Sequence, residues 1–288
     1  MKKLYKFGVL LISLIVSTNT MAQNDVTISK DIVYAIAEGK NLGLDIYISK
    51  SQKNQPLIVW IHGGAWQTGS KDNPPLGLMP YGYALASVNF RSSTEAKFPA
   101  QIHQIKAAIR FLRANALKYG YNADKIIVWG SSSGGHLAAL VATTNDNTEL
   151  EGKLGNHLQT TSAVQGGIDY YGPTNFLTIL TQSTPHGLNV RLPALALLLG
   201  NTVENVKSLA TLASPVHQVS DNDPPLFIVH GEQDIQVPIN QSIELWTAYK
   251  AKNLKTQIEF VPDAGHSSPA YMKKELLDKI DAFLRKNL

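Results

Sequence analysis

The chain has 288 residues, of which 44% are hydrophobic and 17% charged, so it is long enough to bury a large core. It contains no cysteine, which excludes disulfides, thiolate nucleophiles and metal sites built on cysteine. The formal net charge is +4, but three of the 26 basic residues lie in the first 22 residues, which contain no acidic residue. The rest of the chain has 23 basic and 22 acidic residues, and this balance excludes the excess of positive charge that is typical of nucleic-acid-binding proteins.

Residues 1–22 have the pattern of a secretory signal peptide. Lysines precede a short apolar run, Val9 to Val16, and small residues at Thr20 and Ala22 fit cleavage after Ala22. The run is too short to span a bilayer comfortably, although an uncleaved anchor is the alternative. We expect an exported protein, periplasmic or secreted, with a mature domain over 23–288 and no stable membrane association after signal removal.

Strongly apolar runs follow along the chain. Residues 26–48 predict two or three short strands, in which the alternating segment 44–47 is typical of a half-buried edge strand. Four later runs end in polar or glycine-rich motifs: 56–61, 83–90, 126–129 and 225–229. Strands that are apolar on both faces belong in a parallel sheet that helices cover.

Helical spacing lies between these runs, over 101–116, 133–142, 239–251 and 271–284. The alternation predicts an α/β fold with a mostly parallel, twisted central sheet flanked by helices. The segment 174–219 breaks the alternation and is interpreted as a small helical insertion. A partial lid beside the site and ordinary crossover packing are equally consistent with it.

Ser132 stands in the run Gly130-Ser131-Ser132-Ser133-Gly134, directly after the apolar residues 126–129. A serine at the apex of a tight strand-to-helix turn needs neighbours with little or no Cβ. The pattern alone is weak, because glycine and serine are common residues. Its place at the end of a predicted strand makes Ser132 the candidate nucleophile.

Other motifs that follow strands should meet Ser132, because the ligand crevice of an open parallel sheet lies at the carboxyl ends of its strands. One is His62-Gly63-Gly64-Ala65-Trp66, whose glycines can turn backbone N–H groups toward a developing oxyanion. We expect the oxyanion donors to be Gly64, Ala65 and Ser133, with His62 bracing the loop. The alternative for this loop is a tight turn without function.

The acid and the base come from two later loops. Asp234 is expected to orient an imidazole, and Glu232 is its rival. His266 lies between the strand-like run 256–261 and the last helix, and the chain order Ser, Asp, His is that of α/β-hydrolases. The hypothesis is that Ser132 attacks an acyl carbonyl, His266 moves its proton and Asp234 holds the imidazole.

Taken together, the motifs resemble those of the α/β-hydrolase esterases, and most of all the bifunctional acetylxylan/feruloyl esterase-like (BD-FAE-like) group near the hormone-sensitive-lipase-like carboxylesterases. They are Leu44-Asp45-Ile46-Tyr47, His62 to Trp66, Val88-Asn89-Phe90-Arg91, Gly130 to His136, Ser214-Pro215, His230 to Pro238 and Gly265-His266. The resemblance runs from about Val26 to the C-terminus and implies the same triad. Relatives usually have alanine at Ser133, tyrosine at Phe90 and a third glycine at Ala65, differences that bear on specificity.

The resemblance implies a serine carboxylesterase that cuts acetyl or hydroxycinnamoyl esters on carbohydrate, so its partner would be a small ester or an acylated oligosaccharide. Trp66 is interpreted as lining an aromatic or sugar site, with packing as the alternative. The other hypotheses are a prolyl-oligopeptidase-type peptidase, a lipase, and a non-catalytic binding module on the same scaffold. No cofactor and no metal is expected, and the oligomeric state stays open.

Overall fold

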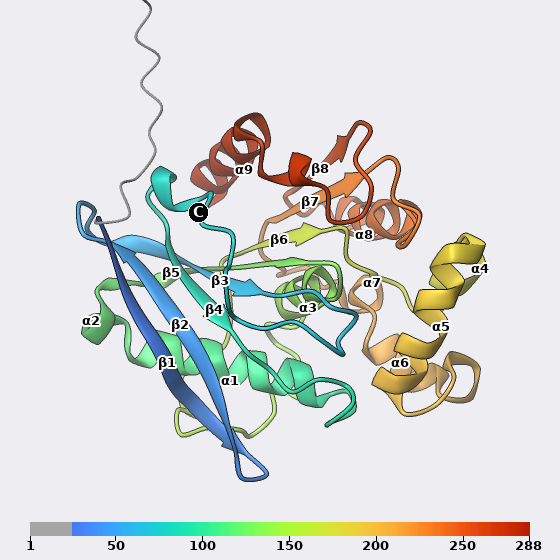
Figure 1. The fold of residues 1–288 in the computed structure, drawn as a ribbon, viewed down its shortest axis with the longest axis horizontal. Coiled ribbons are helices and arrows are strands. Elements are labelled where there is room, and N and C mark those ends of the chain that lie inside the picture. The colour runs from blue at the N-terminus through green and yellow to red at the C-terminus, as the bar shows by residue number, and fades with distance from the viewer. Residues whose placement is uncertain (1–24) are drawn as a thin grey trace, which may run out of the picture.

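The computed structural model describes residues 25–288, and the predicted signal peptide lies outside them. Over this part of the chain, one eight-stranded sheet has the order β1-β2-β4-β3-β5-β6-β7-β8 (Figure 1). The strands are β1 (Val26–Ala37), β2 (Lys40–Ser49), β3 (Gln55–Ile61), β4 (Ala84–Val88), β5 (Tyr121–Ser131), β6 (Gly166–Tyr170), β7 (Leu226–Gly231) and β8 (Thr256–Val261). β2 pairs antiparallel with β1 and β4, and the remaining pairs are parallel. The predicted mostly parallel sheet is confirmed.

Helices cover both faces of this sheet. On one face, α1 (Ala100–Ala114), α3 (Ser133–Ala142) and α8 (Asn240–Ala251) contribute to one hydrophobic core that includes Leu57 and Val59 of β3. On the other face, α9 (Lys274–Asn287) packs with Ile58 and Trp60 of the same strand. Successive side chains of a strand point to opposite faces, so an unbroken apolar run supplies two cores at once. The remaining short helices outside the insertion are η2 (Met79–Tyr81), α2 (Ala116–Tyr119) and η4 (Pro269–Met272).

The segment 174–219 is helical through much of its length. It contains α4 (Ile179–Gln182), α5 (Pro185–Leu199), η3 (Val203–Asn205), α6 (Lys207–Leu212) and α7 (Pro215–Gln218). Figure 1 shows α4, α5 and α6 grouped at one end of the sheet, beside the strand ends that carry the polar motifs. Both ends of α5 are tied to the body: the Thr184 hydroxyl donates to the carbonyl of Ile235 at 2.8 Å, and the Phe98 N–H donates to the carbonyl of Leu198 at 2.9 Å.

The expectation of a half-buried edge strand at 44–47 is wrong. β1 pairs along β2 and takes the edge of the sheet, so β2 is an inner strand in which Leu44 and Ile46 are buried. Asp45 is buried as well, and a buried carboxylate needs a partner for its charge because it has lost its contact with water. That partner is Lys71, whose Nζ lies 2.9 Å from the Asp45 carboxylate and 2.8 Å from Asp31.

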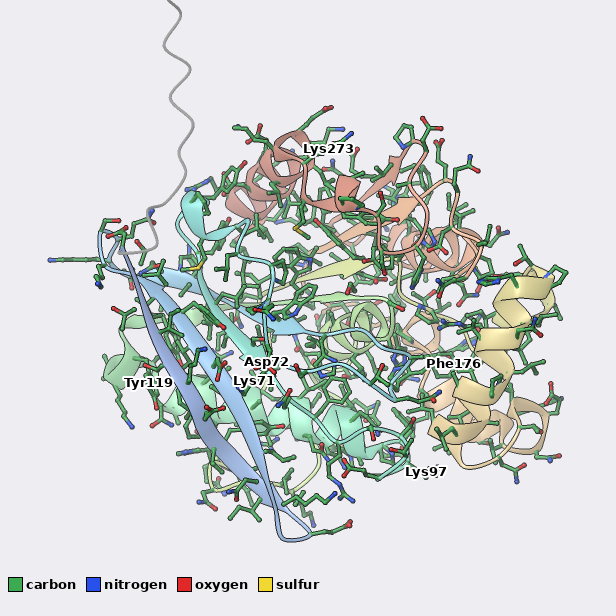
Figure 2. All side chains as sticks on the ribbon, viewed as in Figure 1. Lys71, Asp72, Lys97, Tyr119, Phe176 and Lys273 are labelled. Atoms are coloured by element: carbon green, nitrogen blue, oxygen red, sulfur yellow. The ribbon has the colours of Figure 1, made fainter. Side chains whose placement is uncertain are left out.

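The Lys71 ammonium joins the first two strands to the loop that follows β3. Burial lowers its pKa, but the hydrogen bonds to Asp31 and Asp45 outweigh burial and raise the pKa above its usual range. The Ser87 hydroxyl of β4 donates to the backbone carbonyl of Lys71 at 2.7 Å. In Figure 2, Lys71 and its neighbour Asp72 lie over this group of strands.

Replacing Lys71 by methionine should therefore lower the free energy of unfolding by about 3–5 kcal/mol, because it leaves the buried Asp45 carboxylate without a cation. Urea unfolding followed by circular dichroism measures the change. The matched control is Lys40→Met, which removes an ion pair to Glu95. Because the Lys40 side chain is 59% exposed, this change should lower the free energy of unfolding by about 1 kcal/mol or less. Equal losses in the two variants would contradict a stabilising role for Lys71.

No helix long and apolar enough to cross a membrane is found among residues 25–288.

Candidate active site

Ser132 occupies a strained turn between β5 and α3. Its backbone angles are φ 55° and ψ −122°, a region that residues with a Cβ rarely adopt. The turn is held from both sides: the Ser132 N–H donates to the carbonyl of Tyr170 at 2.8 Å, and the His136 N–H donates to the carbonyl of Ser132 at 2.9 Å. The hydroxyl is thereby presented at the carboxyl end of the sheet.

The two glycines of the motif are required by close approach of the backbone. A Cβ on Gly130 would collide with the carbonyl of Gly134, and a Cβ on Gly134 would collide with the carbonyls of Ile61 and His62. The first turn of α3 thus lies directly against the end of β3. This contact brings the loop after β3 next to Ser132.

The structure brings Ser132, His266 and Asp234 together from three separate segments. The Ser132 Oγ lies 2.9 Å from Nε2 of His266, and Nδ1 of the same ring lies 2.7 Å from Oδ2 of Asp234. An ionised carboxylate only accepts, so Nδ1 carries the proton and donates to Asp234. In the neutral ring Nε2 is then free to accept from the serine hydroxyl. Glu232, the rival acid, is exposed, and His266 pairs with Asp234 instead.

The carboxylate of Asp234 has no exposed surface, and both of its oxygens are used. Oδ1 accepts the backbone N–H groups of Gln236 and Val237 at 2.8 and 3.0 Å, while Oδ2 faces His266 and His230. Burial raises its pKa, but the hydrogen bonds from His230 and His266 outweigh burial and bring the pKa of Asp234 well below its usual range. The carboxylate is therefore ionised throughout the neutral range.

The loop after β3 turns through three successive residues of positive φ, Gly64, Ala65 and Trp66. Neither Gly64 nor Ala65 donates its N–H to another residue in the described part of the chain. Ser133 is the first residue of α3, where the N–H has no helical partner. These three N–H groups are those expected as oxyanion donors. His62 stacks on Phe90 with ring centroids 4.5 Å apart and bonds within the loop, in keeping with a bracing role.

The interpretation of Trp66 as a substrate contact is not met by the structure. Its side chain is fully buried, its indole N–H donates to Nδ1 of His136 at 3.1 Å, and its ring packs on Phe176. Nε2 of His136 in turn donates to the carbonyl of Ala213 at 2.7 Å. Trp66 is an apolar anchor that fixes the left-handed loop to α3 and to the insertion. Figure 2 marks Phe176 where the insertion joins the body of the fold.

A pocket of about 440 Å³ opens over Ser132. It is lined by the loop after β3, by Ser131, Ser132, His266 and Ser267, by Gln236, and by Val190 and Arg191 of α5. The helical insertion therefore forms one wall of the site. No group of three or more histidine, aspartate or glutamate side chains suited to a metal ion occurs among residues 25–288.

Two residues near the site were given no role from the sequence, although His230 begins one of its motifs. Tyr171 follows β6, has φ 44°, and packs against the His266 ring in a T-shaped arrangement with ring centroids 4.8 Å apart. His230 is the last residue but one of β7; its Nε2 donates to the carbonyl of Val237 at 3.0 Å and lies 3.5 Å from Asp234, while Nδ1 accepts from the Ser242 hydroxyl at 2.7 Å. Each comes directly after or at the end of a parallel strand, which is the signal that was available for both.

Asp169 of β6 is a buried acid beneath this turn. Its Oδ1 accepts the N–H of Gly172 at 2.9 Å, and Oδ2 has no hydrogen-bond partner among the described residues. Burial raises the pKa of Asp169 to about 7, against the opposing effects of the Gly172 N–H and of His230. A Cβ on Gly135 would collide with Oδ1, so the carboxyl group packs against the start of α3.

This acid should make stability depend on pH. The folded state binds its proton up to about pH 7, whereas the unfolded chain releases it near pH 4, so the contribution of Asp169 falls as pH rises between these values. The free energy of unfolding of the unchanged protein, minus that of Asp169→Asn, should decrease from about pH 4 to about pH 7 and then level off. Subtraction removes the opposite trend from His136, whose pKa burial lowers to about 4. A difference that does not change with pH would contradict the raised pKa.

A parallel sheet with a serine at a glycine-flanked strand-to-helix turn, facing a histidine and a buried aspartate, is the arrangement of the α/β-hydrolases. The BD-FAE family model matches residues 44–249, and the chain belongs to that family.

Solved structures share this fold closely. One is a truncated form of a carbohydrate esterase from gut microbiota, 32% identical with a TM-score of 0.83, covering 92% of this chain and 98% of that one. Another is the bifunctional GH43-CE of Bacteroides eggerthii, 33% identical with a TM-score of 0.81, covering 90% of this chain and 35% of that one.

Among curated proteins, the probable carboxylic ester hydrolase LipM of Mycobacterium tuberculosis is 30% identical over 191 residues, which are 65% of this chain and 43% of that protein. This chain spans about half the length of the curated relatives that it matches.

Proposed function

We propose that this protein is a serine carboxylesterase that hydrolyses short acyl or hydroxycinnamoyl esters, with carbohydrate as the alcohol. The observation that carries the proposal is the chain of two hydrogen bonds, at 2.9 and 2.7 Å, from Ser132 through His266 to Asp234. The family match and the carbohydrate esterases of the same fold support the class of reaction and the class of substrate.

In the proposed reaction, Ser132 Oγ attacks the ester carbonyl while Nε2 of His266 takes its proton. Asp234 holds the ring in the tautomer that leaves Nε2 free and stabilises the imidazolium that forms. The negative charge on the carbonyl oxygen is met by the N–H groups of Gly64, Ala65 and Ser133, and one such donor is typically worth about 3–4 kcal/mol of barrier. Nε2–H then protonates the leaving alcohol as the tetrahedral intermediate collapses to an acyl-serine.

The second half of the reaction uses the same groups in the same order. Water attacks the acyl-serine while His266 takes a proton from it, and the collapse returns the proton to the Ser132 oxygen and releases the acid. The strained turn at Ser132 and the three successive residues of positive φ in the oxyanion loop are present in the structure without a substrate. Because these dipoles are already oriented, no part of the barrier goes to arranging them.

Replacing Ser132 by alanine should lower kcat for p-nitrophenyl acetate by about three to six orders of magnitude. Asp234→Asn should lower kcat about ten-thousandfold, since the amide favours the wrong tautomer of His266. Glu232→Gln is the matched control at an exposed acid of the same loop and should keep the rate of the unchanged protein. Full activity in Ser132→Ala would overturn the proposal.

The same panel separates the alternatives. Longer p-nitrophenyl esters, acetylated xylan and methyl ferulate define the acyl and alcohol preference. Similarity to dipeptidyl aminopeptidase BIII of Pseudoxanthomonas mexicana, 28% identical over 75% of this chain, makes a dipeptidyl anilide a necessary arm. Cleavage of the anilide without ester cleavage would favour a peptidase. Failure of a fluorophosphonate to label Ser132 would favour a binding module.

A further inference from the structure

Arg191 of α5 is a buried arginine in the wall of the pocket over Ser132. Its side chain is 1% exposed, and it lies among the residues that line the pocket. Its Nε and Nη1 have no hydrogen-bond partner, and no ion pair among residues 25–288 includes it. A guanidinium removed from water without a partner costs several kcal/mol, so such a group requires a reason.

Other buried arginines of this chain are paired. Nη2 of Arg91 donates to the Glu38 carboxylate at 2.9 Å and to the carbonyl of Glu95 at 3.0 Å. Arg110 bonds the carboxylate of Glu151 and donates through Nη2 to the carbonyl of Leu154 at 2.8 Å. The fold therefore supplies anions to arginines that serve its own packing, and it supplies none to Arg191.

The charge of Arg191 persists at neutral pH. Burial lowers its pKa to about 10, and the charge of Asp234 opposes that effect. Asp234 is not its partner, because both carboxylate oxygens are already taken by the backbone of the loop and by the two histidines. The lining of the pocket contains no aspartate or glutamate within the described part of the chain. The wall of the pocket over Ser132 thus contains a cation to which no carboxylate of the described residues is hydrogen-bonded.

The start of the helix that carries Arg191 is held against the loop of the catalytic acid. At the start of α5, the Thr184 hydroxyl caps the helix by accepting the N–H of Gly187 at 3.0 Å and donates to Ile235 beside the catalytic acid. A Cβ on Gly187 would lie 3.1 Å from the carbonyls of Ile235 and Gln236, so the helix lies close against that loop. A rigid fork of N–H donors is well matched to a carboxylate, which it can bind through two parallel hydrogen bonds.

We propose that Arg191 binds a carboxylate of the substrate, so that the preferred esters are those that carry a free carboxylate close to the scissile bond. This inference rests on the proposed esterase function. Two chemical sources supply such a group: a uronic acid in the alcohol part, or a dicarboxylic half-ester in the acyl part. Both place an anion in the same pocket as the reacting carbonyl.

The test compares matched charged and neutral esters. One pair is O-acetylated glucuronic acid against O-acetylated glucose, and the other is p-nitrophenyl hydrogen adipate against p-nitrophenyl hexanoate. In the unchanged protein, kcat/KM for the charged member of at least one pair should exceed that of the neutral member by about tenfold or more. The pair that shows the preference identifies the source of the carboxylate. Equal kcat/KM values within both pairs would overturn the proposal.

Variants of Arg191 test whether a preference for charged esters comes from its guanidinium. In Arg191→Gln the ratio of charged to neutral kcat/KM should fall about tenfold, and Arg191→Lys should restore part of it because a cation returns without the planar fork. Arg285→Gln is the matched control, on an arginine of α9 whose side chain is 61% exposed. A ratio that stays at the unchanged value in Arg191→Gln would overturn the assignment.

A binding measurement covers the case in which Arg191→Gln does not fold. Two matched pairs of inhibitors represent the two sources: sodium glucuronate against glucose, and sodium adipamate against hexanamide. The charged member of at least one pair should inhibit the unchanged protein competitively at lower concentration than the neutral member, and its inhibition constant should rise with ionic strength as an ion pair requires. Equal inhibition within both pairs would count against the proposal. Failure of the esterase function itself is distinguished separately, because it would show as loss of Ser132-dependent cleavage of the neutral p-nitrophenyl acetate.

Discussion

The site depends on how closely three backbones approach one another at the end of β3. The carbonyls of Ile61 and His62 lie where a side chain at position 134 would be, and the carbonyl of Gly134 lies where one at position 130 would be. This contact forces Ser132 into its strained conformation and at the same time seats the oxyanion loop beside it. Nucleophile and oxyanion donors are therefore positioned by one packing contact rather than by two independent loops.

Much of the fold and of this constellation could be predicted from the sequence because it follows from local rules. Runs that are apolar on both faces predict parallel strands, and the polar motif after each run then lies at one edge of the sheet. That reasoning placed Ser132, Asp234 and His266 at one edge, and the structure joins them through hydrogen bonds. Their catalytic roles, and the export predicted from residues 1–22, stay predictions.

What the sequence could not supply is information about which side chains lose their contact with water. Trp66 stands next to the oxyanion donors in sequence, yet its ring points into the core, where His136 and Phe176 enclose it. The segment 44–47 alternates like an edge strand, but the pairing of β1 along it and the ion pair to Lys71 make it internal. Arg191 belongs to no sequence motif. Its guanidinium can be recognised as unpaired only when the residues around it in the structure are known.

The ion pair between Lys71 and Asp45 has a consequence for how ligands reach the serine. The loop that holds the oxyanion donors follows directly from β3. Further along this loop, Lys71 forms an ion pair with Asp45 of β2, and between these two points the Trp66 indole donates a hydrogen bond to His136 of α3. A loop held at three points is the constrained wall of the pocket over Ser132. The size of the groups admitted there then depends on the wall that α5 contributes through Val190 and Arg191, and side-chain changes at these two positions would alter which esters fit while leaving Ser132, His266 and Asp234 in place.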